Sequence, residues 1–190
     1  MQISILLLLA HAQHGKTTDT LKADTLPAQA QVKTEKSPSD QTKDRTYPEG
    51  VKLHPALAHF AMAFPFFLAL LEVMYLLKGR PPDLIEGTSV FITSAAVVSA
   101  TLSGTYAHNL MYGIPISAEA ESLLHTHENF GLLLAGVFSL LLLLRLVYAF
   151  LPNRTLRYAF LILLLVSLPL VLYQGFMGGK LVYDFGVGVR

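Results

Sequence analysis

The first long apolar segment of this chain begins with Leu53-His54-Pro55-Ala56-Leu57-Ala58-His59-Phe60, which places two histidines where an apolar helix starts. Ionisable side chains at membrane depth are costly, and by default they mark a functional site. The chain has 190 residues, of which 53% are hydrophobic and only 14% are charged. This composition excludes an ordinary soluble domain and predicts a membrane protein whose first partner is the lipid bilayer.

Three further apolar segments follow, and each segment is long enough to cross a hydrocarbon core of about 30 Å as a helix. The four expected spans are 54–77, 85–108, 125–150 and 156–177. Short connections between the first two spans and between the last two make successive helices antiparallel. Ser117 is a suitable N-cap, so the third helix is expected to begin near it, outside the membrane. We therefore predict an all-α, integral membrane four-helix bundle.

The residues before and after the bundle are predicted to form no part of the membrane domain. An apolar run followed by Ala10-His11-Ala12 indicates a signal peptide over 1–12. Residues 13–50 are polar and almost free of large apolar side chains, which predicts a disordered external arm. The transmembrane domain is then 51–180. Gly178-Gly179 is interpreted as a helix stop, followed by an extended external tail over 181–190.

The loop charges predict the orientation of the bundle. Lys78 and Arg80 lie in the first short connection, and Arg154 and Arg157 lie in the second, whereas the 109–124 loop has no Lys or Arg. Basic loops face the cytoplasm, so the long loop is external. A secreted N-terminal arm requires the same orientation. We expect a multi-pass protein of the bacterial inner membrane with both termini on the external, periplasmic side.

Five histidines then fall in one layer near the external surface: His54, His59, His108, His125 and His127. At about 100° per residue, His54 and His59 are about 140° apart around their helix, so they cannot both face one partner. Because a residue before proline is disfavoured in a helix, His54 is interpreted as a rim residue and His59 as the buried one. By the same geometry only one of His125 and His127 can point inward, and His127 is expected to do so.

The inner histidines each have a small residue one helical turn deeper on the same face: Ala63 below His59, Gly104 below His108 and Gly131 below His127. An imidazole ligand beside a missing side chain suits a flat ring held between helices, as in haem-binding bundles. We predict a b-type haem for electron transfer, with His59 and His127 as ligands and His108 as a substitute for either. Close helix packing alone would also favour such small residues.

The alternative is a non-redox membrane subunit whose histidines bind Cu or Zn or serve only the structure. Neutral imidazole suits these metals as well as iron, and all five histidines are candidates. Glu128, beside His127, could bind a metal or orient an imidazole. No nucleophile–base arrangement or nucleotide fingerprint occurs, so enzyme activity is left open. The net charge of +1 gives no reason to expect a nucleic-acid partner.

Two other charges lie within the spans at matching depth on the cytoplasmic side. Glu72 is in the first span and Arg145 in the third. An ion pair between them would lower the cost of placing both in the membrane, whereas each could instead extend separately to the interface.

The ends of the membrane region carry motifs: His54-Pro55-x-x-x-His59-Phe60 and Gly178-Gly179-Lys180-Leu181-Val182-Tyr183-x-x-Gly186-Val187-Gly188-Val189. With Gly104 in the second span and a histidine opening the third, this region resembles the bacterial membrane family called domain of unknown function 2231. The resemblance covers roughly residues 50–190. It implies a four-span domain often found with electron-transfer or cytochrome-like modules. It implies no established activity. For an electron-transfer role, the expected partner is a redox protein or a larger membrane complex.

Overall fold

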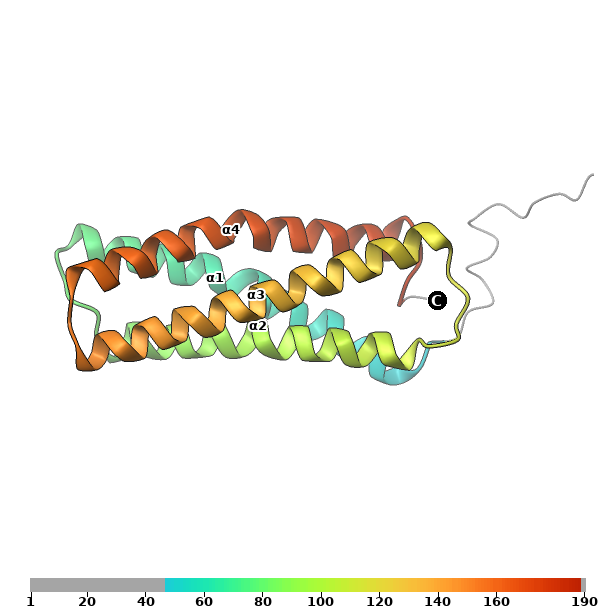
Figure 1. Cartoon of the computed structure of the whole chain (residues 1–190), viewed down its shortest axis with the longest axis horizontal. Coiled ribbons are helices and arrows are strands. Elements are labelled where there is room, and N and C mark those ends of the chain that lie inside the picture. The colour runs from blue at the N-terminus through green and yellow to red at the C-terminus, as the bar shows by residue number, and fades with distance from the viewer. Residues whose placement is uncertain (1–46, 189–190) are drawn as a thin grey trace, which may run out of the picture. The chain divides into compact units, whose positions relative to one another are not determined.

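The computed structural model describes residues 47–188. The predicted signal peptide and the predicted linker up to residue 46 lie outside this range. Four long helices form the described part: α1 (Leu53–Leu77), α2 (Leu84–Leu110), α3 (Ala118–Phe150) and α4 (Arg154–Tyr183), with a short 3₁₀ helix, η1 (Glu49–Lys52), before α1 (Figure 1). The predicted all-α four-helix bundle is confirmed.

Each helix is long and apolar enough to cross a membrane. The shortest, α1, has 25 residues. At 1.5 Å per residue it is about 38 Å long, which exceeds a hydrocarbon core of about 30 Å. Large apolar side chains such as Phe67, Leu84, Leu146 and Phe176 are exposed on the bundle surface. An outward-facing apolar surface of this kind suits contact with lipid chains.

Polar caps set where three of the helices begin. Asp83 accepts hydrogen bonds from the backbone N–H groups of Ile85 and Glu86 at the start of α2. The Ser117 hydroxyl accepts one from Ala120 N at 3.2 Å, so the predicted start of the third helix is confirmed. Asn153 caps α4 through Thr155 N at 2.7 Å. Each cap satisfies a backbone donor that has no partner within its helix.

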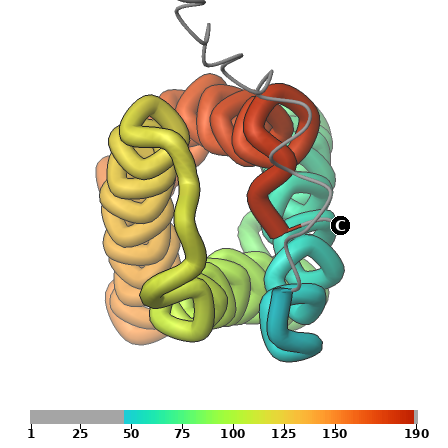
Figure 2. Tube along the Cα trace, turned by 90° about the vertical axis from the view of Figure 1, so that its right-hand side faces the viewer, coloured from blue at the N-terminus to red at the C-terminus, as the bar shows by residue number. Residues whose placement is uncertain are grey.

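The helices are neighbours around a ring, in which α1 contacts α2 and α4, and α3 contacts the same two helices (Figure 2). The ring has two ends, which differ in composition. The end where α1 and α3 begin and α2 and α4 finish is called the histidine end. The opposite end, with the short connections 78–83 and 151–153, is called the charged end. Between them the core is filled by large side chains, including Phe138, Leu141 and Leu164, which are fully buried.

The C-terminal segment corrects one prediction. Helix α4 continues through Gly178 and Gly179 to Tyr183, so these glycines are not a helix stop. The following turn bends inward from the end of α4 (Figure 2), with Gly186 and Gly188 at positive φ. Val187 packs among buried side chains at the start of α3 and the end of α4. Residues 184–188 therefore form a folded turn against the histidine end and not an extended tail.

The charged end contains an ion pair that the sequence analysis did not predict. Arg145 on α3 forms an ion pair with Glu86 on α2, so Arg145 neither pairs with Glu72 nor extends separately to the interface, the two alternatives that the sequence left open. The side chains of Glu86 and Arg145 are 0% and 12% exposed. Glu72 is also buried, and it borders a small pocket together with Arg145 and Arg157. The arginine thus lies near two buried carboxylates, which lowers the cost of placing each charge at membrane depth.

Candidate functional site

Two histidines face each other at the histidine end. His54 lies in the first turn of α1, and His127 lies in the third turn of α3, the helix diagonally opposite in the ring. Both side chains are half-buried. Their ring centroids are 6.1 Å apart and their planes are nearly perpendicular, at 80°. The bundle therefore brings together two imidazoles that the sequence separates by more than 70 residues.

Hydrogen bonds from α2 fix the His54 ring. Its Nδ1 lies 3.0 Å from the carbonyl oxygen of Ala100 and 3.1 Å from the hydroxyl oxygen of Ser103. A carbonyl oxygen only accepts, so Nδ1 carries the proton and Nε2 keeps a lone pair. Nε2 makes no hydrogen bond with any described residue. The same arrangement is common in metal-ligating histidines, which usually donate their other N–H to a carbonyl or carboxylate oxygen.

The His127 ring is held from α4. The Gln174 side-chain nitrogen donates to the His127 carbonyl oxygen at 2.9 Å and lies 3.4 Å from the ring nitrogen Nε2. The other ring nitrogen, Nδ1, is buried and has no hydrogen-bond partner among residues 47–188. A buried polar atom without a partner is uncommon in a folded protein and calls for an explanation such as a bound group.

A glycine lies against each of the two rings. A Cβ atom added at Gly104 on α2 would come within 3.0 Å of His54 Cε1, and one at Gly178 on α4 within 3.1 Å of His127 Cε1. Contacts this short require the ring to move. The two glycines therefore permit the positions of the two imidazoles. Gly104 was predicted as a site residue below His108, but the structure places it beneath His54.

Both rings line a cavity of about 720 Å³. This volume is within the range of about 300–1,000 Å³ that is usual for ligand pockets. Most of the wall is apolar or small, and the polar groups are few. Residues on the wall include His59, His108, Glu128, Gln174, Met62, Thr101, Ala63, Gly104, Gly131 and Gly178.

The prediction that His59 is buried and His54 lies at the rim is wrong. His59 is exposed at the cavity edge, where its Nδ1 lies 2.5 Å from the carbonyl oxygen of Pro55. His54 is helical in spite of the following proline, because Pro55 falls in the first turn of α1, where its missing N–H removes no helical bond. Because His54 and His59 are about 140° apart around the helix, His59 points away from the His54–His127 pair.

The two small residues predicted below His59 and His127 both lie on the cavity wall. Ala63 is exposed there, whereas Gly131 is buried. The Thr101 hydroxyl donates to the Gly131 carbonyl oxygen at 3.0 Å. A Cβ at Gly131 would lie 3.3 Å from the Gln174 side-chain nitrogen. Gly131 thus also permits the close contact of α3 with α2 and α4.

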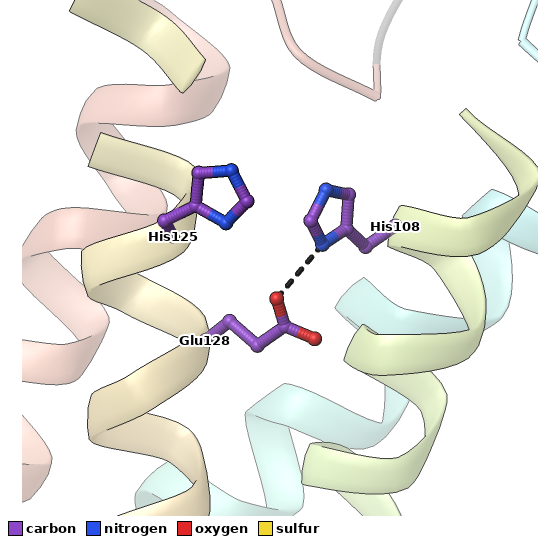
Figure 3. Close-up of side chains that lie close together, drawn as sticks. All are labelled: His108, His125 and Glu128. Carbon is purple, nitrogen blue, oxygen red and sulfur yellow. Dashed lines mark hydrogen bonds and ion pairs between the residues drawn. The ribbon is translucent and has the colours of Figure 1, made fainter. Parts of the chain in front are cut away.

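The other two histidines lie in a second cluster, between α2 and α3 (Figure 3). His108 Nδ1 is 2.8 Å from Glu128 Oε2. The rings of His108 and His125 are 5.2 Å apart at their centroids. One ligand atom from each of the three residues lies within 4.8 Å of the others. His125 is exposed and does not point into the bundle, as predicted, whereas His108 and Glu128 are half-buried.

The sequence analysis did not identify Gln174 as a site residue, and it interpreted Gly178 as part of a helix stop. Gln174 is a polar residue within the apolar run of the fourth span, and that position could have marked it as part of a site. Gly178 gave no such signal, since its role depends on contact with a histidine in another helix.

Comparison with protein families identifies the family to which the chain belongs. A family model described as a predicted membrane protein, DUF2231, matches residues 50–190. The chain belongs to the DUF2231 family. The resemblance stated from the sequence motifs is confirmed, and the match covers the whole described bundle of this DUF2231 protein. Comparisons with curated proteins and with solved structures give no match.

Proposed function

We propose that this DUF2231 protein binds one b-type haem in the cavity of the histidine end and acts in electron transfer. His54 and His127 are the proposed axial ligands, which replaces the sequence-based pair of His59 and His127. The observation that carries the proposal is the pair of imidazoles facing each other within a cavity of about 720 Å³.

The separation of the two rings supports this assignment. A metal–imidazole nitrogen bond is about 2.0–2.1 Å long. With the metal between two imidazoles, the ring centroids would therefore be about 6 Å apart. The observed distance is 6.1 Å. Small residues on the surrounding wall leave room for a flat macrocycle. Gly104 and Gly178 leave space for the imidazole rings of His54 and His127.

The chain's own residues would determine the chemistry of the site. The Ala100 carbonyl holds the His54 proton on Nδ1 and leaves Nε2 free to bind. The wall is largely apolar, so it offers few groups that would hold water in the cavity. Bound haem would supply a one-electron couple, and His54 and His127 would both be used to hold it, which would leave no ligand position for a substrate. Electron transfer is therefore favoured over oxygen binding or activation.

The distribution of basic residues supports an orientation in the membrane. Lys78, Arg80 and Arg154 lie at the charged end, whereas the 111–117 connection at the histidine end has no Lys or Arg. By the positive-inside rule the charged end faces the cytoplasm of a bacterial cell and the haem site faces the periplasm. A periplasmic or membrane-bound redox protein is then the proposed partner.

A reporter that is active only in the periplasm tests this orientation. Fused after Ser117, it should be active, and fused after Pro82 it should be inactive. The reverse pattern would place the site on the cytoplasmic side and would overturn the proposed orientation, but not the haem site.

Absorption spectroscopy tests the cofactor. Full-length protein purified in detergent from haem-replete cells should show a Soret band that shifts on reduction, with close to one haem per chain. The same preparation should bind added haemin if it is isolated partly empty. If a folded preparation shows neither a Soret band nor binding of added haemin, the proposed function is wrong.

A further inference from the structure

A second group of ligand-type side chains lies beside the haem cavity. His108 comes from the last turn of α2, whereas His125 and Glu128 come from the third turn of α3 and lie three residues apart on one side of that helix. Figure 3 shows the two imidazoles and the carboxylate around a common space. His108 and Glu128 line the cavity, but His125 is exposed, so this cluster forms part of the wall between the cavity and the exterior.

We propose that His108, His125 and Glu128 bind one divalent first-row transition-metal ion, Zn²⁺ or Cu²⁺. Two imidazoles and one carboxylate are a ligand set suited to these ions. The exposure of His125 leaves a fourth position accessible to water or to a small anionic or imidazole ligand. The proposal is independent of haem binding, because none of its ligands belongs to the His54–His127 pair.

The distances fit an ion after a small movement. Ligand bonds of about 2.0–2.2 Å in tetrahedral geometry place ligand atoms about 3.3–3.6 Å apart. The ligand atoms now lie within 4.8 Å of one another, and His108 Nδ1 lies 2.8 Å from Glu128 Oε2. Small rotations of the three side chains would bring the ligand atoms to the distances that an ion requires. Metal ions compete with protons for imidazole and carboxylate ligands, so affinity should fall as pH is lowered.

Metal titration of the haem-free full-length protein in detergent tests the proposal. With Zn²⁺ as the probe, the parent should bind one more ion per chain than His125→Ala or Glu128→Gln. If that ion is still detected in a variant, its affinity should be reduced by at least about tenfold, as expected when metal-site support is lost. Glu121→Gln is the matched control, since Glu121 is an exposed acid one turn before His125 on the same helix.

Electron paramagnetic resonance with Cu²⁺ gives a second measurement. The signal bound to the parent should show coupling to two imidazole nitrogens, and the signal of His125→Ala should show coupling to one. Glu128→Gln is nearly isosteric, and its melting temperature checks that the variant is folded. Histidines outside the cluster contribute equally to parent and variants. If both folded variants bind the same number of Zn²⁺ ions with the affinity of the parent, the proposed metal site is wrong. The haem content of His125→Ala should be unchanged in either case, since His125 is exposed and does not line the cavity, and this separates the result from failure of the haem proposal.

Discussion

The two ends of the bundle use the same helices for different purposes. Glu72 follows His54 on α1, and Arg145 follows His127 on α3, in each case by 18 residues, which is five helical turns, or about 27 Å along the axis. Each helix therefore presents a polar side chain to the bundle interior at both ends. At the charged end the polar groups adjoin a pocket of only about 10 Å³, whereas at the histidine end they adjoin a cavity of about 720 Å³.

The difference follows from the partners on α2 and α4. At the charged end Glu86 reaches Arg145 directly, and Leu144 and Phe160 border the small pocket. At the histidine end the positions facing the rings are Gly104 and Gly178, which contribute no side chain. Buried polar groups that meet and are enclosed hold the helices together. Polar groups arranged around a space are available to a ligand. Small residues on the neighbouring helices therefore determine whether two inward-facing polar side chains are enclosed or line a cavity.

The largest expected effect on stability is at the charged end. Arg145→Leu would leave Glu86 unpaired and Glu72 with only Arg157 nearby, and loss of one partner of a buried pair costs about 3–5 kcal/mol. Glu86→Leu should cost less, because Arg145 still lies near Glu72. The free energy of unfolding of each purified variant in detergent tests these two expectations. The double variant should recover most of the loss, and additive losses would show that the two residues act separately. Haem content should change in proportion to the folded fraction only.

The next effect concerns the glycines of the histidine end. Gly178→Ala adds a methyl group that must displace the His127 ring, and overpacking of this kind costs about 1–3 kcal/mol. To bind haem, the His127 ring must return to its place against the added methyl group, so the same cost enters the free energy of binding. Haem affinity should then fall by roughly fivefold to 150-fold. Gly179→Ala is the adjacent control, since a Cβ there meets no described atom within 4 Å. Equal affinity in the two variants, measured by haemin titration, would contradict the role given to Gly178.

The smallest effect is expected from Ser103→Ala. The Ser103 hydroxyl supports the His54 ring, but the Ala100 carbonyl remains to accept from Nδ1. Loss of one such hydrogen bond costs about 0.5–1.5 kcal/mol, so haem affinity should fall by roughly tenfold or less. A loss as complete as that of a ligand variant would show that Ser103 has a direct part in binding.

Hydropathy predicted the fold because each apolar segment is long enough to span a bilayer, whatever its neighbours are. The start of α3 was predictable for a similar reason, since the Ser117 cap is a local interaction. The same local signal failed at Gly178-Gly179. These glycines resemble a helix stop, but α4 continues through them, and Gly178 lies there against the His127 ring.

The site could be predicted only in part. The gathering of five histidines at one end follows from the helix positions alone. Which of His54 and His59 faces inward depends on the hydrogen bonds that α2 offers, and Pro55 was a misleading guide to this choice. The partner of Arg145 also depended on tertiary structure, because Glu72 and Glu86 are both buried and both lie near Arg145 at the charged end. Spacing along one helix cannot decide between two carboxylates on different helices.

The haem-to-protein ratio of three histidine variants, with the absorption spectrum of each, tests the central claim most directly. His54→Ala and His127→Ala should each lose nearly all haem, because each removes an axial ligand, and both should remain folded. His59→Ala should keep the haem content and spectrum of the parent, since His59 is exposed and faces away from the pair. His54→Met should retain some haem with an altered spectrum and a raised potential, which a structural role for His54 would not produce. If His59→Ala loses haem while His54→Ala keeps it, the assignment of the ligand pair is contradicted.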